Sequence, residues 1–364
     1  MITRSKDGIY KPKALHATTT STHTVAKCPQ PSSKQCSQFT KSGSSPKPDY
    51  TTTEPPTYKI AAQHPQWCSA MDDEFNALQR QGTWILVPPS PSQNLVGCKW
   101  VYKLKHNSDG SISRYKARLV AKGFHQQFGV DFEETFSPVI KPPTVRIILS
   151  LAVQFNWPFR QLDVSNAFLH GFLREDVYMV QPPGYVNSAH PNHVCKLLKS
   201  LYGLKQAPRA WFERFSTQLL HMGFQASLSD SSLFTLRHGT LVAFLLVYVD
   251  DIVLTGNSPQ FLTSLIAQLS AVFELKDLGP LSYFLGLQIL RTSKGLFVTQ
   301  TKYAQDLFLR VHMHTSKPAR TPCAPNTRLS PTDGTLLSNP HEFRSLVGSL
   351  HYLTFTRPDL SFAV

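Results

Sequence analysis

Apolar and polar residues recur beyond residue 58 with spacings typical of helices and strands. The sharpest pattern lies at residues 241–256, where an apolar run rich in β-branched and aromatic residues stops at Asp250 and Asp251 and then resumes. It predicts two buried strands of a hairpin, with both aspartates at or beside the turn. Val249-Asp250-Asp251 is poor turn chemistry, and carboxylates beside a buried strand are costly without a cation. Turns often carry solvated aspartates, but local rules broken at one point indicate a functional site.

The pattern upstream predicts a helix followed by a basic hairpin. Residues 67–78 carry apolar side chains at helical spacing, and Gly82 ends the helix. Residues 99–105 and 115–122 alternate as strands do and flank a turn signal at 107–110. The polar positions of both strands are mostly Lys and Arg. This favours phosphate binding over the alternative that the lysines only deter edge pairing.

A short strand at 159–163 ends at Asp163, and Ser165 or Asn166 can cap a helix that follows. Asp163 is therefore expected at the carboxyl end of a strand, where sites usually form in α/β sheets. The pattern predicts further elements, in chain order: a helix over 145–155, a helix over 212–220, a helix over 261–273, a strand over 283–290 interrupted by Gly286, a helix over 302–311, and an apolar segment from 343.

Composition adds a disordered segment and a basic charge balance. Residues 1–58 are rich in Ser, Thr, Pro, Lys and Gln, which predicts a disordered linker. The chain has 37 Lys and Arg against 23 Asp and Glu, a formal net charge of +14. Residues 1–58 hold only eight of the basic and three of the acidic residues. The folded part is therefore basic itself, and a basic surface attracts polyanions such as nucleic acid.

The sequence also bears on location. No apolar run approaches the length of a membrane span, and no signal-like segment opens the chain. The six cysteines form no CxxC pair, which fits free thiols in a reducing interior. We therefore expect an intracellular protein.

The three aspartates predict a chemistry if they meet in the fold. In nucleotidyl transfer a 3′-hydroxyl attacks the α-phosphate of a nucleotide, and two Mg²⁺ ions stabilise the attacking and departing oxygens. Such ions need closely spaced carboxylates. Asp163, Asp250 and Asp251 supply them if the strand at 159–163 pairs with the hairpin. The ions would also relieve the repulsion among three like charges.

Several boxes, in order along the chain, resemble one family. Residues 248–251 resemble the catalytic hairpin of reverse transcriptases, and the run from Trp67 to Val364 resembles the reverse transcriptase of copia-type LTR retrotransposons. The other boxes that carry the resemblance are residues 97–101, 115–124, 134–139, 161–171, 201–211 and 283–286. Several ordered boxes are far more specific than any single one.

The resemblance implies an α+β right-hand polymerase with fingers, a palm built on an antiparallel sheet and a thumb, preceded by a disordered tail. It implies this division of the chain: a polyprotein-derived linker at 1–58, an N-terminal helix and fingers at 59–158, the palm with part of the fingers, the aspartate triad and the primer grip at 159–290, a thumb-like segment and linker at 291–330, and the start of a connection segment at 331–364. The chain is expected to stop before a ribonuclease H.

The resemblance also implies roles for single residues. Asp163, Asp250 and Asp251 match a catalytic triad that binds two Mg²⁺ ions, for which Mn²⁺ can substitute. Phe168 matches the aromatic gate whose ring occupies the space of a 2′-hydroxyl; the alternative is an ordinary core aromatic. Lys116 and Arg118 are the two candidates for binding the incoming triphosphate. Tyr202 and Gly203 match the segment that lies under the template and the nucleotide. Phe284, Leu285 and Gly286 match the primer grip. Retroviral enzymes carry Gln at the position of Tyr202.

We therefore expect an RNA-directed DNA polymerase that extends a primer 3′-hydroxyl with dNTPs. Its expected partners are an RNA template and a DNA or RNA primer, with no membrane, in the cytoplasm or in retrotransposon particles. One alternative is a truncated, inactive retrotransposon relic that at most binds nucleic acid. A template-independent or RNA-synthesising polymerase would share the triad but would not need Phe168 as a gate.

Overall fold

The structure is a computed structural model. It describes residues 49–107, 109–293, 295–318, 330 and 334–364. They belong to a unit spanning Pro48–Val364. Of the linker predicted at 1–58, residues 1–48 lie outside the described residues.

Residues 49–58 pack on the folded unit, in contrast to the predicted linker boundary at residue 58. The Trp67 indole nitrogen donates to the Tyr50 carbonyl at 2.7 Å, and the Tyr115 hydroxyl donates to the Thr51 carbonyl at 2.7 Å. The folded unit therefore begins before residue 59, because long-range hydrogen bonds compensate for the polar composition of this segment.

The sequence forms helices and strands in the following order along the described residues. The helices are α1 (Tyr58–Ala61), α2 (Pro65–Arg80), η1 (Gly123–His125), α3 (Pro142–Gln154), η2 (Ala167–His170), α4 (Ala207–His221), α5 (Pro259–Ser270), α6 (Thr301–Arg310), α7 (Pro340–Leu353) and η3 (Pro358–Leu360). The strands are β1 (Trp84–Val87), β2 (Leu95–Val96), β3 (Cys98–His106), β4 (Ile112–Ala121), β5 (Phe159–Val164), β6 (Phe172–Met179), β7 (Val194–Lys199), β8 (Gln225–Ala226), β9 (Leu233–His238), β10 (Leu241–Tyr248), β11 (Asp251–Gly256), β12 (Leu275–Gly279), β13 (Tyr283–Phe284), β14 (Leu287–Thr292) and β15 (Gly295–Thr299).

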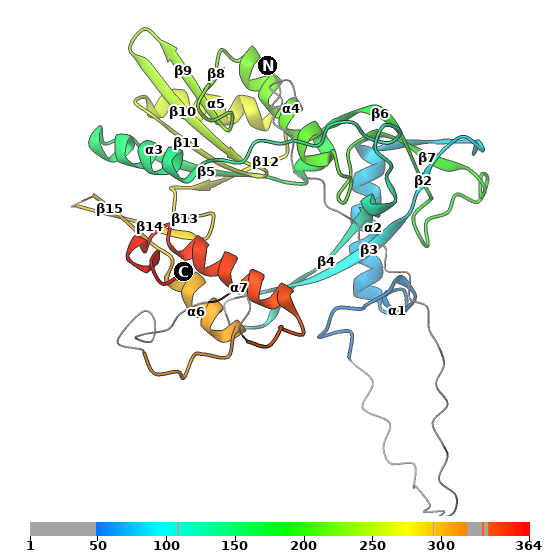
Figure 1. Cartoon of the computed structure of the whole chain (residues 1–364). Coiled ribbons are helices and arrows are strands. Elements are labelled where there is room, and N and C mark those ends of the chain that lie inside the picture. The colour runs from blue at the N-terminus through cyan, green and yellow to red at the C-terminus, as the bar shows by residue number, and fades with distance from the viewer. Residues whose placement is uncertain (1–48, 108, 294, 319–329, 331–333) are drawn as a thin grey trace, which may run out of the picture. The chain divides into compact units, whose positions relative to one another are not determined.

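The central sheet has six antiparallel strands in the order β12-β5-β11-β10-β9-β8 (Figure 1). Successive side chains on a strand point to opposite faces. Leu245 and Val247 of β10 belong to a core shared with α4 and α5, whereas Leu246 belongs to a core shared with α3, β13 and β14. Burial on both faces explains why the sequence at 241–249 is continuously apolar instead of alternating.

A second core forms around the long hairpin of β3 and β4, which lies along α2 (Figure 1). The same core includes residues from the four-stranded sheet with the order β1-β7-β6-β2. In the hairpin, one side of each strand is buried, and the Lys and Arg positions stay exposed or half-buried. The predicted basic hairpin is thus observed at 98–121.

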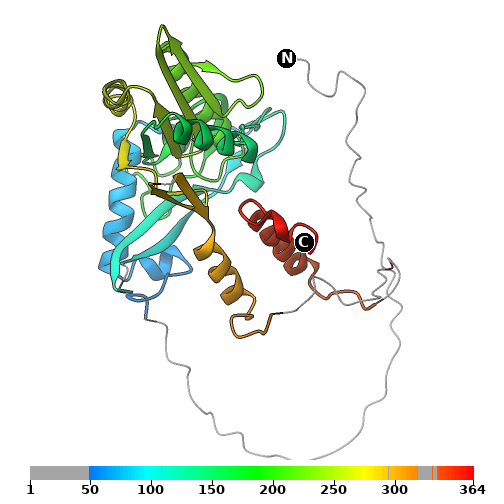
Figure 2. The same ribbon diagram turned by 90° about the vertical axis from the view of Figure 1, so that its left-hand side faces the viewer.

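The C-terminal part contains the sheet β13-β14-β15 and the helices α6 and α7 (Figures 1 and 2). The Tyr303 hydroxyl of α6 donates to the Ser349 carbonyl of α7 at 3.1 Å, and the Arg146 guanidinium of α3 donates to the Phe355 carbonyl at 2.5 Å. These hydrogen bonds join residues 340–355 to the rest of the unit.

Two local predictions differ from the structure. Residues 283–290 form two strands instead of one interrupted strand, because Leu285 and Gly286 are the two loop residues of a tight hairpin with φ of 51° and 75°. Positive φ at both loop residues is the geometry of a type I′ turn. After β5, Asn166 is left-handed with φ of 52° and makes no side-chain cap, so the short 3₁₀ helix η2 follows without the predicted capping bond.

The length and polarity of the helices are relevant to membrane insertion. None of the described helices is long and apolar enough to span a membrane.

Candidate active site

The three aspartates lie next to one another where the carboxyl end of β5 pairs with the start of β11. Asp251 is directly opposite Asp163 in the antiparallel register. Paired residues point to the same face of a sheet, here the face covered by α3 and β13–β14. The Asp250 carbonyl accepts a hydrogen bond from the Val164 amide at 3.0 Å, which joins the hairpin tip to the end of β5. The pairing on which the predicted site depends is therefore present.

The hairpin tip is a two-residue turn with a strained backbone. Tyr248 pairs with Asp251, so Val249 and Asp250 are the loop residues. Val249 has a φ of 55°. A β-branched residue is a genuine outlier at positive φ, and such conformations cost about 1–3 kcal/mol and persist only where neighbouring contacts hold them in place. The poor turn chemistry in the sequence thus corresponds to actual strain beside the carboxylates.

The carboxylates repel one another. Burial, with a further contribution from Asp250, raises the pKa of Asp163, which Lys116, Lys276 and Arg118 oppose. Burial, Asp250 and Asp163 together raise the pKa of Asp251 to about 6. Opposite-charge neighbours favour the ionised form, so a cation bound here would reverse these shifts.

The donor set fits Mg²⁺ by its chemistry. Mg²⁺ binds to oxygen ligands and commonly to one or two carboxylates. Three carboxylates lie together here, and two of them, Asp163 and Asp251, have raised pKa values. As the side chains lie, no three His, Cys, Asp or Glu residues within the described part of the chain form a group that could hold a metal ion. Asp163, Asp250 and Asp251 would therefore hold an ion only after their side chains turn toward it.

A cavity of about 700 Å³ lies between β4, α2 and the carboxyl end of β5. Asp163 and Asp250 line it together with Lys116 and Arg118. The Arg118 Nε is buried and has no hydrogen-bond partner among the described residues. Burial, together with Arg118 and Arg114, lowers the pKa of Lys116. Five acidic side chains also line this cavity: Asp73, Glu74, Asp163, Asp250 and Glu274. Within the described residues, however, neither Lys116 nor Arg118 forms an ion pair, so the free Arg118 Nε is a donor that suits an anionic ligand.

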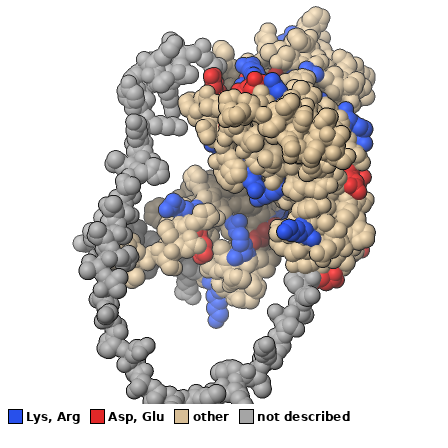
Figure 3. Space-filling view, turned by 90° about the vertical axis from the view of Figure 1, so that its right-hand side faces the viewer, with Lys and Arg blue, Asp and Glu red and all other residues tan. Residues whose placement is uncertain are grey.

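Figure 3 shows Lys and Arg side chains around the hollow in the middle of the face that it presents. A surface of this sign attracts phosphates over the distance of a Debye length. Asp and Glu side chains are also visible on this face (Figure 3), and the excess of Lys and Arg is a property of the whole sequence.

Phe168 and Tyr202 lie behind Arg118 and do not line this cavity. The Arg118 guanidinium carbon is 4.4 Å from the centroid of the Tyr202 ring, and the Phe168 and Tyr202 ring centroids are 5.1 Å apart at 66°. Phe168 is half-buried and contacts both the core around β3–β4 and the core of the central sheet. The structure thus joins the predicted gate residue to a predicted triphosphate residue through Tyr202.

Gly203 allows the 201–204 segment to approach β4 closely. The Ala121 amide donates to the Tyr202 carbonyl at 2.7 Å, and a Cβ at Gly203 would lie 2.1 Å from the Ala121 carbonyl oxygen. Gly203 also has a φ of 90°, which L-residues with a side chain rarely adopt. Only glycine satisfies both requirements at this position.

The predicted primer-grip residues lie in the hairpin of β13 and β14. Phe284 is fully buried in the core, while Leu285 and Gly286 line a second cavity of about 540 Å³ together with Asp251. The Tyr352 hydroxyl from α7 donates to the Leu285 carbonyl. Asp251 therefore faces the second cavity, whereas Asp163 and Asp250 face the first.

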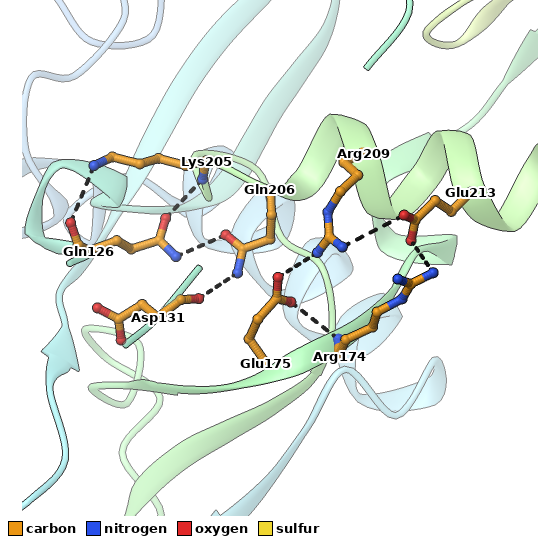
Figure 4. Close-up of polar contacts among 8 residues, drawn as sticks. All are labelled: Gln126, Asp131, Arg174, Glu175, Lys205, Gln206, Arg209 and Glu213. Carbon is orange, nitrogen blue, oxygen red and sulfur yellow. Dashed lines mark hydrogen bonds and ion pairs between the residues drawn. The ribbon is translucent and has the colours of Figure 1, made fainter. Parts of the chain in front are cut away.

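Two hydrogen-bonded groups fix the 201–211 segment against the loop after η1 and against β6 (Figure 4). Lys205 and Gln206 bond to Gln126, and Gln206 also donates to the Asp131 carbonyl at 2.8 Å. The buried Arg209 pairs with Glu175 at 2.6 Å. A buried ion pair with one partner removed is strongly destabilising, so the start of α4 is tightly positioned.

The sequence-based reasoning missed three residues at this site. Glu74 lines the first cavity, is only 7% exposed, and has a pKa that burial raises. Lys276 on β12 is directly opposite Asp163. Trp211 donates its indole N–H to the Val249 carbonyl at 2.7 Å. Glu74 lies beside the apolar stripe of the helix predicted at 67–78, and Trp211 is the last residue of the box at 201–211. Neither pattern indicates which residue of another element the side chain contacts.

Comparisons with known proteins place the sequence among polymerases. Residues 81–325 match the family model described as reverse transcriptase (RNA-dependent DNA polymerase). The chain is similar to the retrovirus-related Pol polyprotein from transposon RE1 of Arabidopsis thaliana, with 53% identity over 86% of this chain and 21% of that protein. It is similar to the polyprotein from transposon RE2 of Arabidopsis thaliana, with 47% identity over 100% of this chain and 23% of that protein. It is also similar to the one from transposon TNT 1-94 of Nicotiana tabacum, with 42% identity over 85% of this chain and 24% of that protein. The chain thus spans less than a quarter of the length of these relatives.

Proposed function

We propose that this chain, which belongs to the reverse transcriptase (RNA-dependent DNA polymerase) family and to its copia-type retrotransposon branch, extends a primer 3′-hydroxyl with dNTPs on an RNA template. The observation that carries the proposal is the pairing of Asp163 with Asp251, next to Asp250, with Asp163 and Asp250 in a cavity that Lys116 and Arg118 also line. The family suggests nucleotidyl transfer as the reaction, and we assign that reaction to these aspartates.

We assign the parts of a right hand as follows. The central sheet with α3, α4 and α5 would be the palm, and the β3–β4 hairpin with α2 would be the fingers. Helix α6 would belong to the thumb-like segment, and α7 to the start of the connection segment. The support is that the carboxylates lie on the central sheet and the basic residues on the hairpin. Residues 49–58 would belong to the fingers, since Tyr50 and Thr51 bond to Trp67 and Tyr115.

In the proposed site, Asp163, Asp250 and Asp251 would hold two Mg²⁺ ions, with Mn²⁺ able to substitute. Such ions stabilise charge on the attacking and departing oxygens. Lys116 and Arg118 would bind the triphosphate, since the buried Arg118 Nε has no partner among the described residues. Phe168 would restrict the space beside the sugar. Its contact with the Tyr202 ring supports this role, because a ring packed against another ring cannot easily move aside.

The second cavity is the proposed location of the primer end. Leu285 and Gly286 line it next to Asp251, and their tight turn presents backbone groups at its wall. An RNA template and a DNA or RNA primer would be the partners, attracted by the net charge of +14.

Primer extension tests the proposal. The full chain, an RNA template, a 5′-labelled DNA primer, dNTPs and Mg²⁺ should give extended primer, and Asp250→Asn should lower the rate by at least about 100-fold. The matched control is Asp176→Asn, which removes a carboxylate that pairs with Lys196 on the surface and should leave the rate unchanged.

Two results would contradict the proposal. One is equal incorporation by the wild-type chain and Asp250→Asn. The other is a wild-type chain that is folded and binds a primer–template but extends nothing, which would favour the inactive relic that only binds nucleic acid.

A further inference from the structure

We propose that Trp211 is a positioning residue for the aspartate pair, acting through the backbone of the hairpin tip. The indole nitrogen donates to the Val249 carbonyl at 2.7 Å, and the side chain is 1% exposed. Tryptophan can only donate through this nitrogen. The carbonyl of a turn residue points out of the strand ladder and needs a partner from elsewhere, and Trp211 supplies that partner.

Trp211 lies on the opposite face of the central sheet from the paired carboxylates. It belongs to the core of α4 and α5 with Leu245 and Val247, whereas Asp251 shares a face with Val253 in the other core. The indole is therefore separated from the cavities that Asp163, Asp250 and Asp251 line. Any effect of Trp211 on the site must pass through the tip itself.

The bond acts at a strained point. Val249 is held at a φ of 55°, which persists only when surrounding contacts determine it. The next carbonyl, that of Asp250, accepts from the Val164 amide at 3.0 Å. Hydrogen bonds to two consecutive carbonyls fix the peptide groups on both sides of Asp250. The direction of the Asp250 side chain, and the start of β11 at Asp251, follow from these two peptide groups.

The position of Trp211 is itself fixed. Its ring contacts Phe215 and Phe273, with ring centroids 5.1 and 5.4 Å away. The backbone of α4 approaches Gly171 so closely that a Cβ there would lie 2.7 Å from the Trp211 nitrogen. The Arg209–Glu175 pair holds the preceding residues of α4 (Figure 4). Because the Trp211 indole is held in this way, its hydrogen bond can restrict the motion of the hairpin tip.

The test compares Trp211→Phe, Val249→Gly, the double variant and the matched control Trp67→Phe. Trp67 is also buried and donates its indole N–H to a backbone carbonyl at 2.7 Å, but its acceptor is Tyr50, in the β3–β4 part of the molecule. The first readout is hydrogen exchange of the peptide covering residues 246–253, measured on the full chain without metal or nucleic acid. It does not depend on any enzymatic activity.

We expect Trp211→Phe to speed exchange at the tip about tenfold, the effect of one lost hydrogen bond on local opening. Trp67→Phe should leave exchange at the tip unchanged. In the Val249→Gly background, where glycine adopts positive φ without strain, Trp211→Phe should change exchange less than about twofold. Tip exchange equal to wild type in Trp211→Phe, or equal effects in both backgrounds, would overturn the inference.

The second readout is primer extension, and this arm rests on the proposed function. Trp211→Phe should lower kcat about tenfold with little change in the KM for dNTP, and Val249→Gly should restore part of the loss. An equal loss in Trp67→Phe would indicate general destabilisation and overturn the inference. If the wild-type chain extends no primer, the proposed function fails, and hydrogen exchange still decides the role of Trp211.

A second variant covers the case in which Trp211→Phe does not fold. The isostere β-(3-benzothienyl)alanine at position 211 keeps the ring volume and replaces the N–H by sulfur. It should speed exchange at the tip to the same extent as Trp211→Phe. Wild-type exchange in this variant would equally overturn the inference.

Discussion

Single residues at the sheet edge are placed where their charge is unfavourable without a cation. Asp251 and Asp163 are direct cross-strand neighbours on one face, and like charges directly opposite each other destabilise a sheet. The burial that raises both pKa values adds to this cost. Asp163 and Asp251 therefore destabilise the fold at the position where the proposed reaction needs negative charge to bind metal ions.

Asp251→Asn should therefore stabilise the metal-free chain at pH 7. The folded-state pKa of about 6 lies above the unfolded value of about 3.9, so the folded state retains the proton longer. Stability falls as pH rises from about 4 to about 6, and the full cost is present at pH 7. We expect the variant to gain about 1–2 kcal/mol at pH 7, less than the whole shift because the carboxyl keeps some solvent contact, and the gain to shrink toward pH 4.

Urea unfolding with EDTA at pH 7 and pH 4 measures the difference between Asp251→Asn and the wild-type chain. Asp176→Asn, on the surface, is the control and should show no such pH dependence. A variant less stable than the wild-type chain at pH 7 would mean that Asp251 is stabilised in the fold by a partner other than a metal.

Phe168 tests a second residue-scale role. Phe168→Ala should raise the kcat/KM ratio of ribonucleotides to deoxyribonucleotides by at least about tenfold, because removing the ring opens space beside the sugar. Single-nucleotide incorporation on an RNA template measures the ratio. Phe172→Ala, which removes an exposed phenyl ring four residues further on, should not change it. An unchanged ratio in Phe168→Ala would leave Phe168 as a core aromatic.

At the scale of elements, the site depends on close backbone approaches between segments that are distant in sequence. The 201–204 segment lies against the end of β4, and the start of α4 lies against Gly171. Arg118 on β4 and Phe168 on η2 then both reach Tyr202. The hairpin that carries the basic residues and the sheet that carries the carboxylates are thus joined through one short segment.

Gly203→Ala should disrupt this contact. The new Cβ would meet the Ala121 carbonyl oxygen, and φ of 90° would be strained as well, so we expect a loss of more than about 3 kcal/mol in the free energy of unfolding. Gly239→Ala is the matched control, because Gly239 also has positive φ but its Cβ would meet nothing within 4 Å. It should cost about 1 kcal/mol. Thermal unfolding compares the two, and similar losses would show that strain alone matters at Gly203.

The elements themselves were largely predictable, and their exceptions have local causes. The aspartate hairpin, the basic hairpin, α2, α3 and α6 all follow from periodicity. The β13–β14 hairpin was missed because Leu285 takes positive φ where sequence reasoning expects Asn or Gly. Asn166 looked like a cap but takes the left-handed conformation that asparagine tolerates.

At the scale of the whole molecule, the pairing of β5 with β11 and β12 could not be predicted from the sequence, because no local pattern specifies which distant strands pair. The register that sets Asp163 opposite Asp251 depends on it. The placement of Lys276 beside Asp163 follows from the same pairing. Family resemblance supplied the expectation that the aspartates meet, and the sheet order supplies the physical reason.

The location of the aspartates between two cavities has a consequence for repeated synthesis. Asp163 and Asp250 face one cavity and Asp251 faces the other, so on the proposed function each added nucleotide must cross from the first side to the second before the next can enter. The strained tip is anchored at two carbonyls, so we expect the movement that lets it pass to occur elsewhere. On the proposed function, we expect this movement in the part of the second cavity that Tyr352 and Phe355 line, so processivity would depend on how readily α7 moves away from the Leu285 turn.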